Sequence, residues 1–401
     1  MKGTWILIFI VICLSVVAEN EEPLSNKEEL ASGERIHIIK SIPTTPVRDQ
    51  YKTSTCWSFS GISLLETELI RMGKGEIDLS EMYIVRQNYE RKADKYVRMH
   101  GKINFTPGGE VNDVTDVVAD FGILPESVYS GLKVDEENHT HLEMDKVLEE
   151  YVNTLIQNPN NELSPVWLNG IRNVLDSYLG ELPESFVYEG VEYSPKSFAK
   201  YLGLELDNYV MITSFIHQPY YESIILEVPD NWSWGKSYNI PLEELVQVVD
   251  SAIYRNYSVA WAVDNSEPGF SFEHGLAIVP EIVYAPRSER IAKKWENKSK
   301  EEKETMMFRN RKPVKELIVT AENRQLAFDN YSTTDDHGMH IVGIAEDKEG
   351  KTYYYVKNSW GDDNPYDGFL YVSQAYFKYK TISIMVHKDA LPEAIALKLG
   401  L

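Results

Sequence analysis

The chain has 401 residues, a formal net charge of −22 and a sequence pI of about 4.9. Nucleic acid phosphates and anionic membranes bind Lys/Arg-rich surfaces, so a protein this acidic is not expected to bind either. Hydrophobic residues make up 43% and charged residues 25% of the sequence, as in a soluble globular protein with a core. At this length we expect one elaborated domain or two.

Residues 1–18 have the pattern of a secretory signal peptide. Lys2 gives a positive start, an apolar stretch covers residues 5–17, and Ala18 ends a small-residue cleavage motif. The alternative is a membrane anchor, but the apolar stretch is shorter than the roughly 20 residues needed to span a bilayer. We therefore expect cleavage after Ala18, a secreted or periplasmic protein, and no stable membrane insertion.

Cysteine usage singles out one thiol. The sequence contains two cysteines, and Cys13 would leave with the signal peptide. Residues 19–35 then form a flexible acidic tail, and residues 36–39 form a short strand. A secreted protein with one remaining cysteine, Cys56, cannot form an internal disulfide, and a leftover thiol is a candidate nucleophile.

A helix is predicted to begin at about Cys56. Gly73 is the expected C′ residue that ends it. The positive end of a helix favours a thiolate in its first turn, whereas the alternative is that Cys56 is a small buried hydrophobe. The helix face consists of apolar residues at spacings of three and four: Phe59, Ile62, Leu65, Leu69 and Met72.

Further helices follow in the first 250 residues. Ser80 is the expected N-cap of a helix that reaches about Asn88. Gly108 and Gly109 lie in a tight turn before a helix that ends at Gly122. The pattern from residue 131 to residue 250 is mostly helical, with helices expected over residues 142–155, 168–179 and 241–254.

The last part of the chain has β patterns. Residues 259–264 resemble a buried strand, and a very charged run over residues 287–304 is expected to be a solvated helix or a linker. Residues 339–345 and 352–357 form a hairpin, and residues 369–372 add another strand. We expect an antiparallel sheet here, in the form of a small barrel.

A base and an orienting residue for the thiol are found in this hairpin. His337 and Asn358 lie 21 residues apart, and two adjacent strands can bring them side by side. Thiol catalysis of acyl transfer needs an imidazole base and a third group that fixes the imidazole. His340 is a competing base, but alternation puts it on the opposite strand face, as a core or surface residue. A His337–His340 metal pair is a third alternative.

The motifs around these residues resemble those of papain-like cysteine peptidases. Gln50 lies six residues before the Cys-Trp-Ser-Phe run that starts at Cys56, and Lys-Asn-Ser-Trp-Gly surrounds Asn358. The resemblance implies that Gln50 and the Cys56 N–H form an oxyanion hole. It further implies that Trp360 shields the bond between His337 and Asn358. Gly108 and Gly109 correspond to the glycine pair that lines the substrate groove in this family. No metal or organic cofactor is needed.

Three features resemble the bleomycin hydrolase and aminopeptidase C branch. Cys56 and His337 lie 281 residues apart, against roughly 130–150 in papain-like enzymes, so a large insertion is expected. Thr53 stands where the family has a paired cysteine, and no inhibitory pro-domain is expected. This branch implies a broad aminopeptidase, a C-terminal arm in its own cleft and hexamers. The short tail and the signal peptide depart from it.

We therefore predict an α+β, papain-like fold and a cysteine peptidase that acts on peptide substrates as an aminopeptidase, releasing N-terminal residues. Two alternatives stay open: a secreted endopeptidase with an open groove, and a catalytically silent binding protein of the same fold. The predicted units are a signal peptide (1–18), a tail (19–35), a helical half with the nucleophile (36–130), a mostly helical insertion (131–250), a β-barrel half with His337 and Asn358 (251–390), and a C-terminal tail (391–401).

Overall fold

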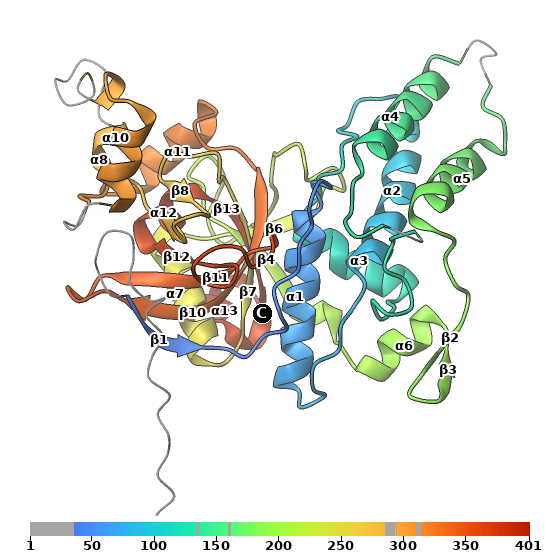
Figure 1. Ribbon diagram of the computed structural model, residues 1–401, viewed down its shortest axis with the longest axis horizontal. Coiled ribbons are helices and arrows are strands. Elements are labelled where there is room, and N and C mark those ends of the chain that lie inside the picture. Colours follow the sequence, from blue (N-terminus) through green and yellow to red (C-terminus); the bar gives the residue numbers. More distant parts are fainter. Residues whose placement is uncertain (1–35, 134–135, 159–161, 285–292, 294, 310–313) are drawn as a thin grey trace, which may run out of the picture.

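The computed structural model describes residues 36–133, 136–158, 162–284, 293, 295–309 and 314–401. The predicted signal peptide and acidic tail, and part of the charged run over residues 287–304, lie outside these residues. In the described ranges, none of the helices has both the length and the apolar character needed to cross a membrane. The molecule has a helical half and a sheet half (Figure 1).

Helix α1 (Cys56–Arg71) lies between the two halves and begins at Cys56, as predicted (Figure 1). Every residue from Trp57 to Leu69 is buried, because the helix packs against strand β10 on one side and helix α3 on the other. A helix enclosed on all sides holds its first turn in a fixed position. A Cβ on Gly61 would lie 2.6 Å from the Val114 side chain, so glycine permits the close approach of α1 and α3.

The helical half confirms most of the predicted elements. Ser80 caps helix α2 by accepting a hydrogen bond from the N–H of Tyr83, and Gly122 ends helix α3. Its further elements are α2 (Glu81–Arg98), α3 (Val111–Phe121), α4 (Leu142–Ile156), α5 (Trp167–Leu179), α6 (Pro195–Leu202), η2 (Leu206–Asn208) and the hairpin of β2 (Phe186–Tyr188) and β3 (Val191–Tyr193).

The sheet half is built on eleven strands in the order β5-β6-β4-β13-β7-β10-β11-β12-β9-β8, with β1 paired to β10. The strands are β1 (His37–Ser41), β4 (Tyr209–Thr213), β5 (Ser223–Ile225), β6 (Lys236–Asn239), β7 (Val259–Val263), β8 (Phe270–Ser271), β9 (Leu276–Ala277), β10 (His337–Glu346), β11 (Thr352–Lys357), β12 (Phe369–Ser373) and β13 (Thr381–His387). The predicted hairpin of β10 and β11 is confirmed.

The sheet differs from the expected small antiparallel barrel in two respects. The β4–β6 and β9–β12 pairs are parallel. In the described part of the chain, the two ends of the strand order, β5 and β8, are not paired with each other. Strands β4 to β6 fall within the region predicted as a mostly helical insertion, where they separate η2 from helix α7 (Leu242–Tyr254).

Short helices complete the sheet half. They are α7 (Leu242–Tyr254), α8 (Glu281–Tyr284), α10 (Lys300–Glu304), the π-helical turn η3 (Thr305–Arg309), α11 (Ala321–Asp329), α12 (Gln374–Lys380), η4 (Lys388–Ala390) and α13 (Glu393–Leu399). Helix α7 packs against strands β1, β7 and β10.

The C-terminal tail folds as helix α13 and packs against the core of the sheet half. Ile395 and Leu399 are 2% and 7% exposed and belong to the same hydrophobic cluster as α7. The Ser251 hydroxyl and the Arg255 guanidinium hold the carbonyls of Ala390 and Leu391. The expectation that this tail lies in the active-site cleft is therefore wrong. The apolar residues of α13 are spaced so that they lie on one face of the helix, and this face packs against the hydrophobic core of the sheet half.

Candidate active site

Cys56 is the first residue of α1, at the boundary between the two halves. The loop before it is held by Thr53, whose hydroxyl donates to the carbonyl of Gln50 at 2.9 Å and lies 2.6 Å from the hydroxyl of Thr55. Thr53 is 1% exposed, and these hydrogen bonds fix the loop at the position where the resemblance placed a paired cysteine in other members of the family. The thiol is free and half-buried.

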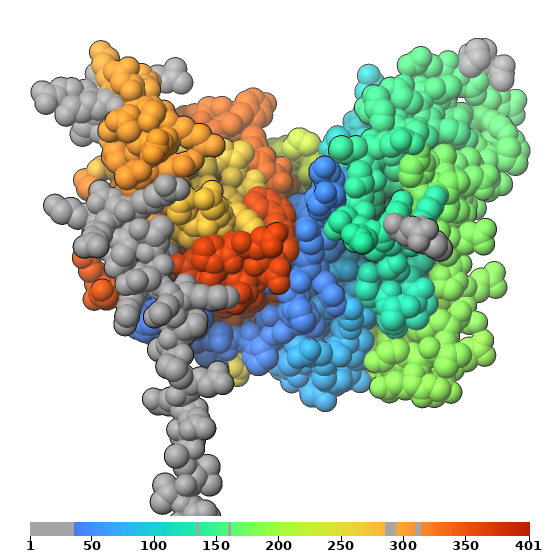
Figure 2. Space-filling view, viewed as in Figure 1, coloured from blue at the N-terminus to red at the C-terminus, as the bar shows by residue number. Residues whose placement is uncertain are grey.

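A cavity of about 520 Å³ opens at this thiol. The surface of the molecule is hollowed between the two halves, at the top of the view in Figure 2. Residues from both halves line the cavity: Gln50, Ser54, Cys56, Trp57, Thr106, Pro107, Gly108, Gly109, Glu110, Val111, Asp230, Ala262, Asn265, Asp335, Asp336, His337, Gly338 and Trp360. Six of the seven predicted site residues are in this set, and Asn358 lies behind His337.

Strands β10 and β11 bring His337 and Asn358 together. His337 Nε2 lies 2.7 Å from Asn358 Oδ1, which also accepts the N–H of Ser359 at 2.9 Å. An amide oxygen is only an acceptor, so Nε2 must carry the proton. The lone pair of the neutral ring is then on Nδ1. Both side chains are buried, at 5% and 3% exposure.

Trp360 covers the His337 ring. The two ring centroids are 4.7 Å apart with an angle of 32° between the planes. Phe270 and Phe272 pack edge-on against the same indole. This aromatic stack keeps water from the side of the imidazole that faces Asn358, where it would compete for the Nε2 proton. Trp360 therefore lies against the imidazole whose contact with Asn358 it is expected to shield.

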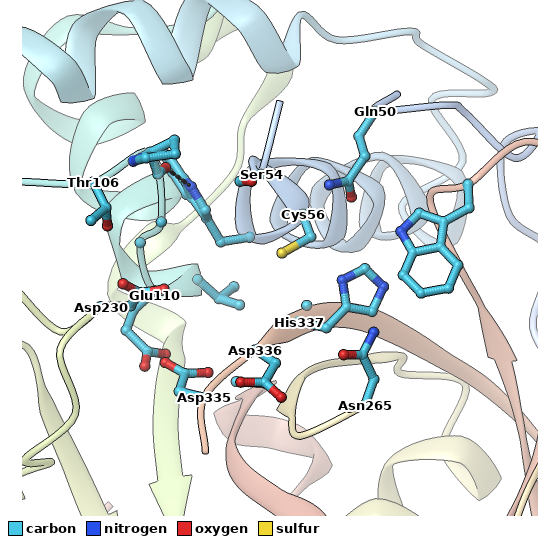
Figure 3. Close-up of a pocket in the computed structure, with 18 residues that line it drawn as sticks. Gln50, Ser54, Cys56, Thr106, Glu110, Asp230, Asn265, Asp335, Asp336 and His337 are labelled. Carbon is cyan, nitrogen blue, oxygen red and sulfur yellow. Dashed lines mark hydrogen bonds between the residues drawn. The ribbon is translucent and has the colours of Figure 1, made fainter. Parts of the chain in front are cut away.

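Gln50 presents its amide NH₂ group to the cavity. The Ser359 hydroxyl donates to Gln50 Oε1 at 2.7 Å, and the Gln50 N–H donates to the Ser359 carbonyl at 2.9 Å. Because Oε1 is occupied by a donor, Nε2 is the group left for the cavity. The Cys56 side chain and the His337 ring project into the same space (Figure 3). One amide donor, a thiol and an imidazole therefore share this part of the cavity.

Burial changes the proton affinities of the thiol and the imidazole in opposite directions. Desolvation raises the pKa of Cys56 to about 12, although a hydrogen bond from the Gly338 N–H opposes it. Desolvation also lowers the pKa of His337 to about 4, against the effect of Asn358. Burial thus opposes the thiolate that was expected at the start of this helix. Both groups are neutral near pH 7.

The backbone at Gly338, Gly108 and Gly109 lies close to the cavity wall. A Cβ on Gly338 would lie 3.1 Å from the Cys56 carbonyl oxygen, so glycine lets β10 reach the start of α1. A Cβ on Gly108 would lie 2.1 Å from Asp230 Oδ2, and one on Gly109 3.0 Å from the Trp57 ring. The glycine pair thus keeps room for side chains that line the cavity.

His340 does not belong to this cavity. It is 1% exposed, and its Nδ1 lies 2.9 Å from the hydroxyl of Ser63 on α1. Desolvation lowers its pKa well below the usual value, so it is a neutral core residue, as predicted. In the part of the chain that the structure describes, no group of three His, Cys, Asp or Glu side chains is arranged to hold a metal ion.

Four carboxyl groups in the cavity were not predicted from the sequence. They belong to Glu110, Asp230, Asp335 and Asp336. Two of them adjoin predicted residues, since Glu110 follows the glycine pair and Asp336 precedes His337, and that adjacency was the available signal. Asp230 lies between β5 and β6, far from any motif, and nothing in the sequence pointed to it.

The chain is similar to known peptidases over most of its length. A model of the Peptidase C1-like family matches residues 294–399. Aminopeptidase G of Lactobacillus delbrueckii subsp. lactis is 23% identical over 407 residues, covering 90% of this chain and 86% of the relative. Aminopeptidase C of Lactococcus lactis subsp. lactis (strain IL1403) is 22% identical over 392 residues, with 87% and 82% covered.

A solved structure has the same fold. The crystal structure of PepW from Lactobacillus rhamnosis HN001 superimposes with a TM-score of 0.68, covering 90% of this chain and 84% of that one at 17% sequence identity. The α+β fold with a helical half and a large mixed sheet is thereby confirmed.

Proposed function

We propose that this chain, which belongs to the papain-like (C1) cysteine peptidases of the aminopeptidase C branch, is an aminopeptidase with a Cys56–His337–Asn358 site. The relatives named as aminopeptidases support the activity. One observation supports the site assignment above all: the 2.7 Å contact that leaves His337 Nδ1 as the acceptor in a cavity shared with the Cys56 thiol.

The reaction begins from a neutral thiol and a neutral imidazole. Each charge alone is costly in the buried site. Proton transfer from Cys56 Sγ to His337 Nδ1 creates two opposite charges together, and their attraction offsets part of that cost. The sulfur then forms a bond to the carbonyl carbon of the peptide, and the imidazolium is held by Asn358.

Collapse of the intermediate completes the cycle. Gln50 Nε2 and the Cys56 N–H, which has no acceptor within the first turn of α1, donate to the oxyanion. His337 returns its proton to the leaving amine as the C–N bond breaks, which leaves a thioester on Cys56. Water, deprotonated by the same nitrogen, hydrolyses the thioester and regenerates the thiol.

The test compares one fluorogenic peptide arylamide with a free amino terminus and its acetylated twin. We expect cleavage of the free peptide that an epoxysuccinyl thiol-protease inhibitor abolishes, and no cleavage by Cys56→Ala. Equal activity of Cys56→Ala would overturn the mechanism. If neither peptide is cut by the unmodified enzyme, the binding-protein alternative is favoured instead.

An endopeptidase is the second candidate, and the position of helix α13 favours it. The tail packs on the core of the sheet half, and none of residues 391–401 lines the cavity. A longer peptide would not meet this segment in the cleft. Comparable cleavage of the acetylated and free peptides would support the endopeptidase.

We also propose that the protein is exported, on the pattern of residues 1–18. Expression of the full chain, followed by fractionation and N-terminal sequencing, tests this. A mature protein that starts at Glu19 outside the cytoplasm is expected. An intact Met1 in the cytoplasm would contradict it.

A further inference from the structure

One carboxylate oxygen in the cavity is buried without a donor. Glu110 is the N-cap of α3, is 3% exposed and lines the cavity beside the glycine pair. Its Oε2 accepts from the Ser383 hydroxyl at 3.3 Å. Its Oε1 has no hydrogen-bond partner among the residues of the described ranges. A buried acceptor without a donor is costly, so this oxygen is suited to a donor that a ligand brings.

Two further carboxyl groups lie beside Glu110. The Asp335 carboxyl group hydrogen-bonds to the Glu110 carboxyl group, and burial together with this neighbour raises the pKa of Asp335 well above its usual value. The Asp230 carboxyl group packs against the backbone of Gly108, in the space that a Cβ on Gly108 would occupy. The side-chain amide of Asn104 donates a hydrogen bond to Asp230 Oδ1 at 3.0 Å. Figure 3 shows the three carboxyl groups together on the side of the cavity away from Gln50.

No basic side chain neutralises this group from within the cavity. Among the described residues that line it there is no Lys or Arg. The nearby Lys92 is 2% exposed and donates its ammonium hydrogens to the carbonyls of Thr106 and Gly108. It does not line the cavity, but its charge lowers the pKa of Asp230 from behind the wall, against the larger effect of burial. Three clustered carboxyl groups repel one another unless protons or a cation reduce their charge.

We propose that Glu110, Asp230 and Asp335 bind the free α-ammonium group of the substrate's N-terminal residue. The inference rests on the proposed function and states how that site recognises a free amino end. An ammonium group has three N–H donors and a positive charge, so it can bond to three carboxyl groups and supply the donor that Glu110 Oε1 needs.

The distance to the thiol favours the α-ammonium over a basic side chain. The α-nitrogen is two bonds from the carbonyl carbon that Cys56 attacks, so its site must lie near the sulfur. Asp335 and Asp230 line the same cavity as Cys56. The ammonium of a Lys side chain, at the end of a four-carbon stem, would be carried further from the scissile bond.

Because α13 packs on the sheet half, another group must bind the amino end of the substrate. In the predicted arrangement, a C-terminal arm in the cleft would have held the substrate's amino end. In this chain that segment is buried in the core of the sheet half. The cavity carboxyl groups supply the hydrogen-bond acceptors from the cavity wall itself. They are contributed by both halves, because Glu110 starts α3 and Asp335 precedes β10.

The test measures kcat and KM for three arylamides with the full-length enzyme and its variants. The substrates are alanyl-arylamide, acetyl-alanyl-arylamide and acetyl-lysyl-alanyl-arylamide. The variants are Glu110→Gln and the double variant Glu110→Gln/Asp335→Asn. Asp120→Asn is the matched control, because it changes an exposed carboxyl group on the same helix that does not line the cavity.

We expect the double variant to raise KM for alanyl-arylamide at least tenfold, while Asp120→Asn leaves it unchanged. An unchanged KM in the double variant overturns the inference. A selective loss for the acetyl-lysyl substrate overturns it too, because the cation would then be a side chain. Titration with an epoxysuccinyl reagent counts the folded sites in each preparation.

A second measurement avoids the variants altogether. Propylammonium should inhibit the unmodified enzyme competitively against alanyl-arylamide, and propanol should inhibit it far less. Equal inhibition by the two compounds would contradict an ammonium site. If thiol-dependent hydrolysis is present but both tests fail, only this inference is lost; if Cys56→Ala is fully active, the proposed function is lost.

Discussion

At the scale of single residues, the chemistry depends on where two amide groups point. Asn358 offers its oxygen to His337, and Gln50 offers its nitrogen to the cavity. In both cases Ser359 sets the orientation, through its N–H to Asn358 and its hydroxyl to Gln50. One residue thus couples the orientation of the base to that of the oxyanion donor.

Removal of the Gln50 donor should affect turnover far more than binding. Gln50→Ala is expected to lower kcat about 100- to 1,000-fold, the usual cost of one oxyanion-hole donor, with little change in KM. Steady-state kinetics with an arylamide measure this. Ser359→Ala, which frees the amide to rotate, should lower kcat less. An unchanged kcat in Gln50→Ala would exclude its role as a donor.

The pH dependence of substrate binding follows from the cavity carboxyl groups. Desolvation raises the pKa of Glu110 to about 7, against a hydrogen bond with Asp335 that lowers it, and the carboxyl groups of Asp113 and Asp230 add to the rise. Glu110 is therefore neutral below that pH and charged above it, so ammonium binding should strengthen as pH rises through 7. It should weaken again above about 8, where the α-amine loses its proton.

KM for alanyl-arylamide should accordingly pass through a minimum between about pH 7 and 8. In Glu110→Gln the acid side of this profile should flatten, because the group that titrates is gone. KM for acetyl-alanyl-arylamide, which has no α-ammonium, should not follow the same profile. A KM that is independent of pH in the unmodified enzyme would contradict this account of the cavity.

The four central residues could be predicted from the sequence, but their proton affinities could not. Gln50, Cys56, His337 and Asn358 occur in local motifs at fixed spacings, and the structure brings them together. The pKa of Cys56 depends instead on how completely the two halves enclose it. Asp230 was missed for a similar reason, because only tertiary packing lays its loop on the glycine pair.

At the scale of elements, α1 positions the site because both of its sides are enclosed. Its start faces the cavity, and the close contacts at Gly61 and Gly338 fix it against α3 and β10. Strands β4 to β6 escaped prediction because they are short and, in β6, largely polar (KSYN). β4 joins the sheet by pairing with β13, a strand that lies far along the chain, and β6 and β5 are added in turn beside β4.

Helix α13 should contribute to stability and not to substrate selection. Ile395→Ala removes a side chain that is 2% exposed, so the free energy of unfolding should fall by about 2–5 kcal/mol. Leu397→Ala on the same helix removes a side chain that is 72% exposed and should cost no more than about 0.5 kcal/mol. Urea unfolding of both variants measures the difference.

The same two variants test whether the tail selects the substrate. Neither should change the ratio of kcat/KM for free and acetylated alanyl-arylamide, because α13 packs on the core and not in the cavity. A selective loss of activity on the free substrate in Ile395→Ala, with unfolding unchanged, would show that the tail reaches the cleft after all.

At the scale of the whole molecule, one thiol between two halves carries the proposed activity. Cys13 lies in the predicted signal peptide, so the mature protein would hold Cys56 alone. Exposure to air should then reduce activity by oxidising this thiol. A reductant should restore the activity of those molecules in which oxidation has stopped at the sulfenic acid. Activity assays before and after thiol addition check this. Full activity after prolonged storage in air would contradict a half-buried, reactive Cys56.

The most direct measurement of the central claim locates a covalent adduct. The enzyme, the His337→Ala variant and the Asp120→Asn control are treated with an epoxysuccinyl inhibitor and examined by intact mass and peptide mapping. The account predicts one adduct per chain, on Cys56, formed rapidly in the enzyme and in the control but far more slowly in His337→Ala. No adduct on Cys56, or equal rates with and without the imidazole, would contradict it.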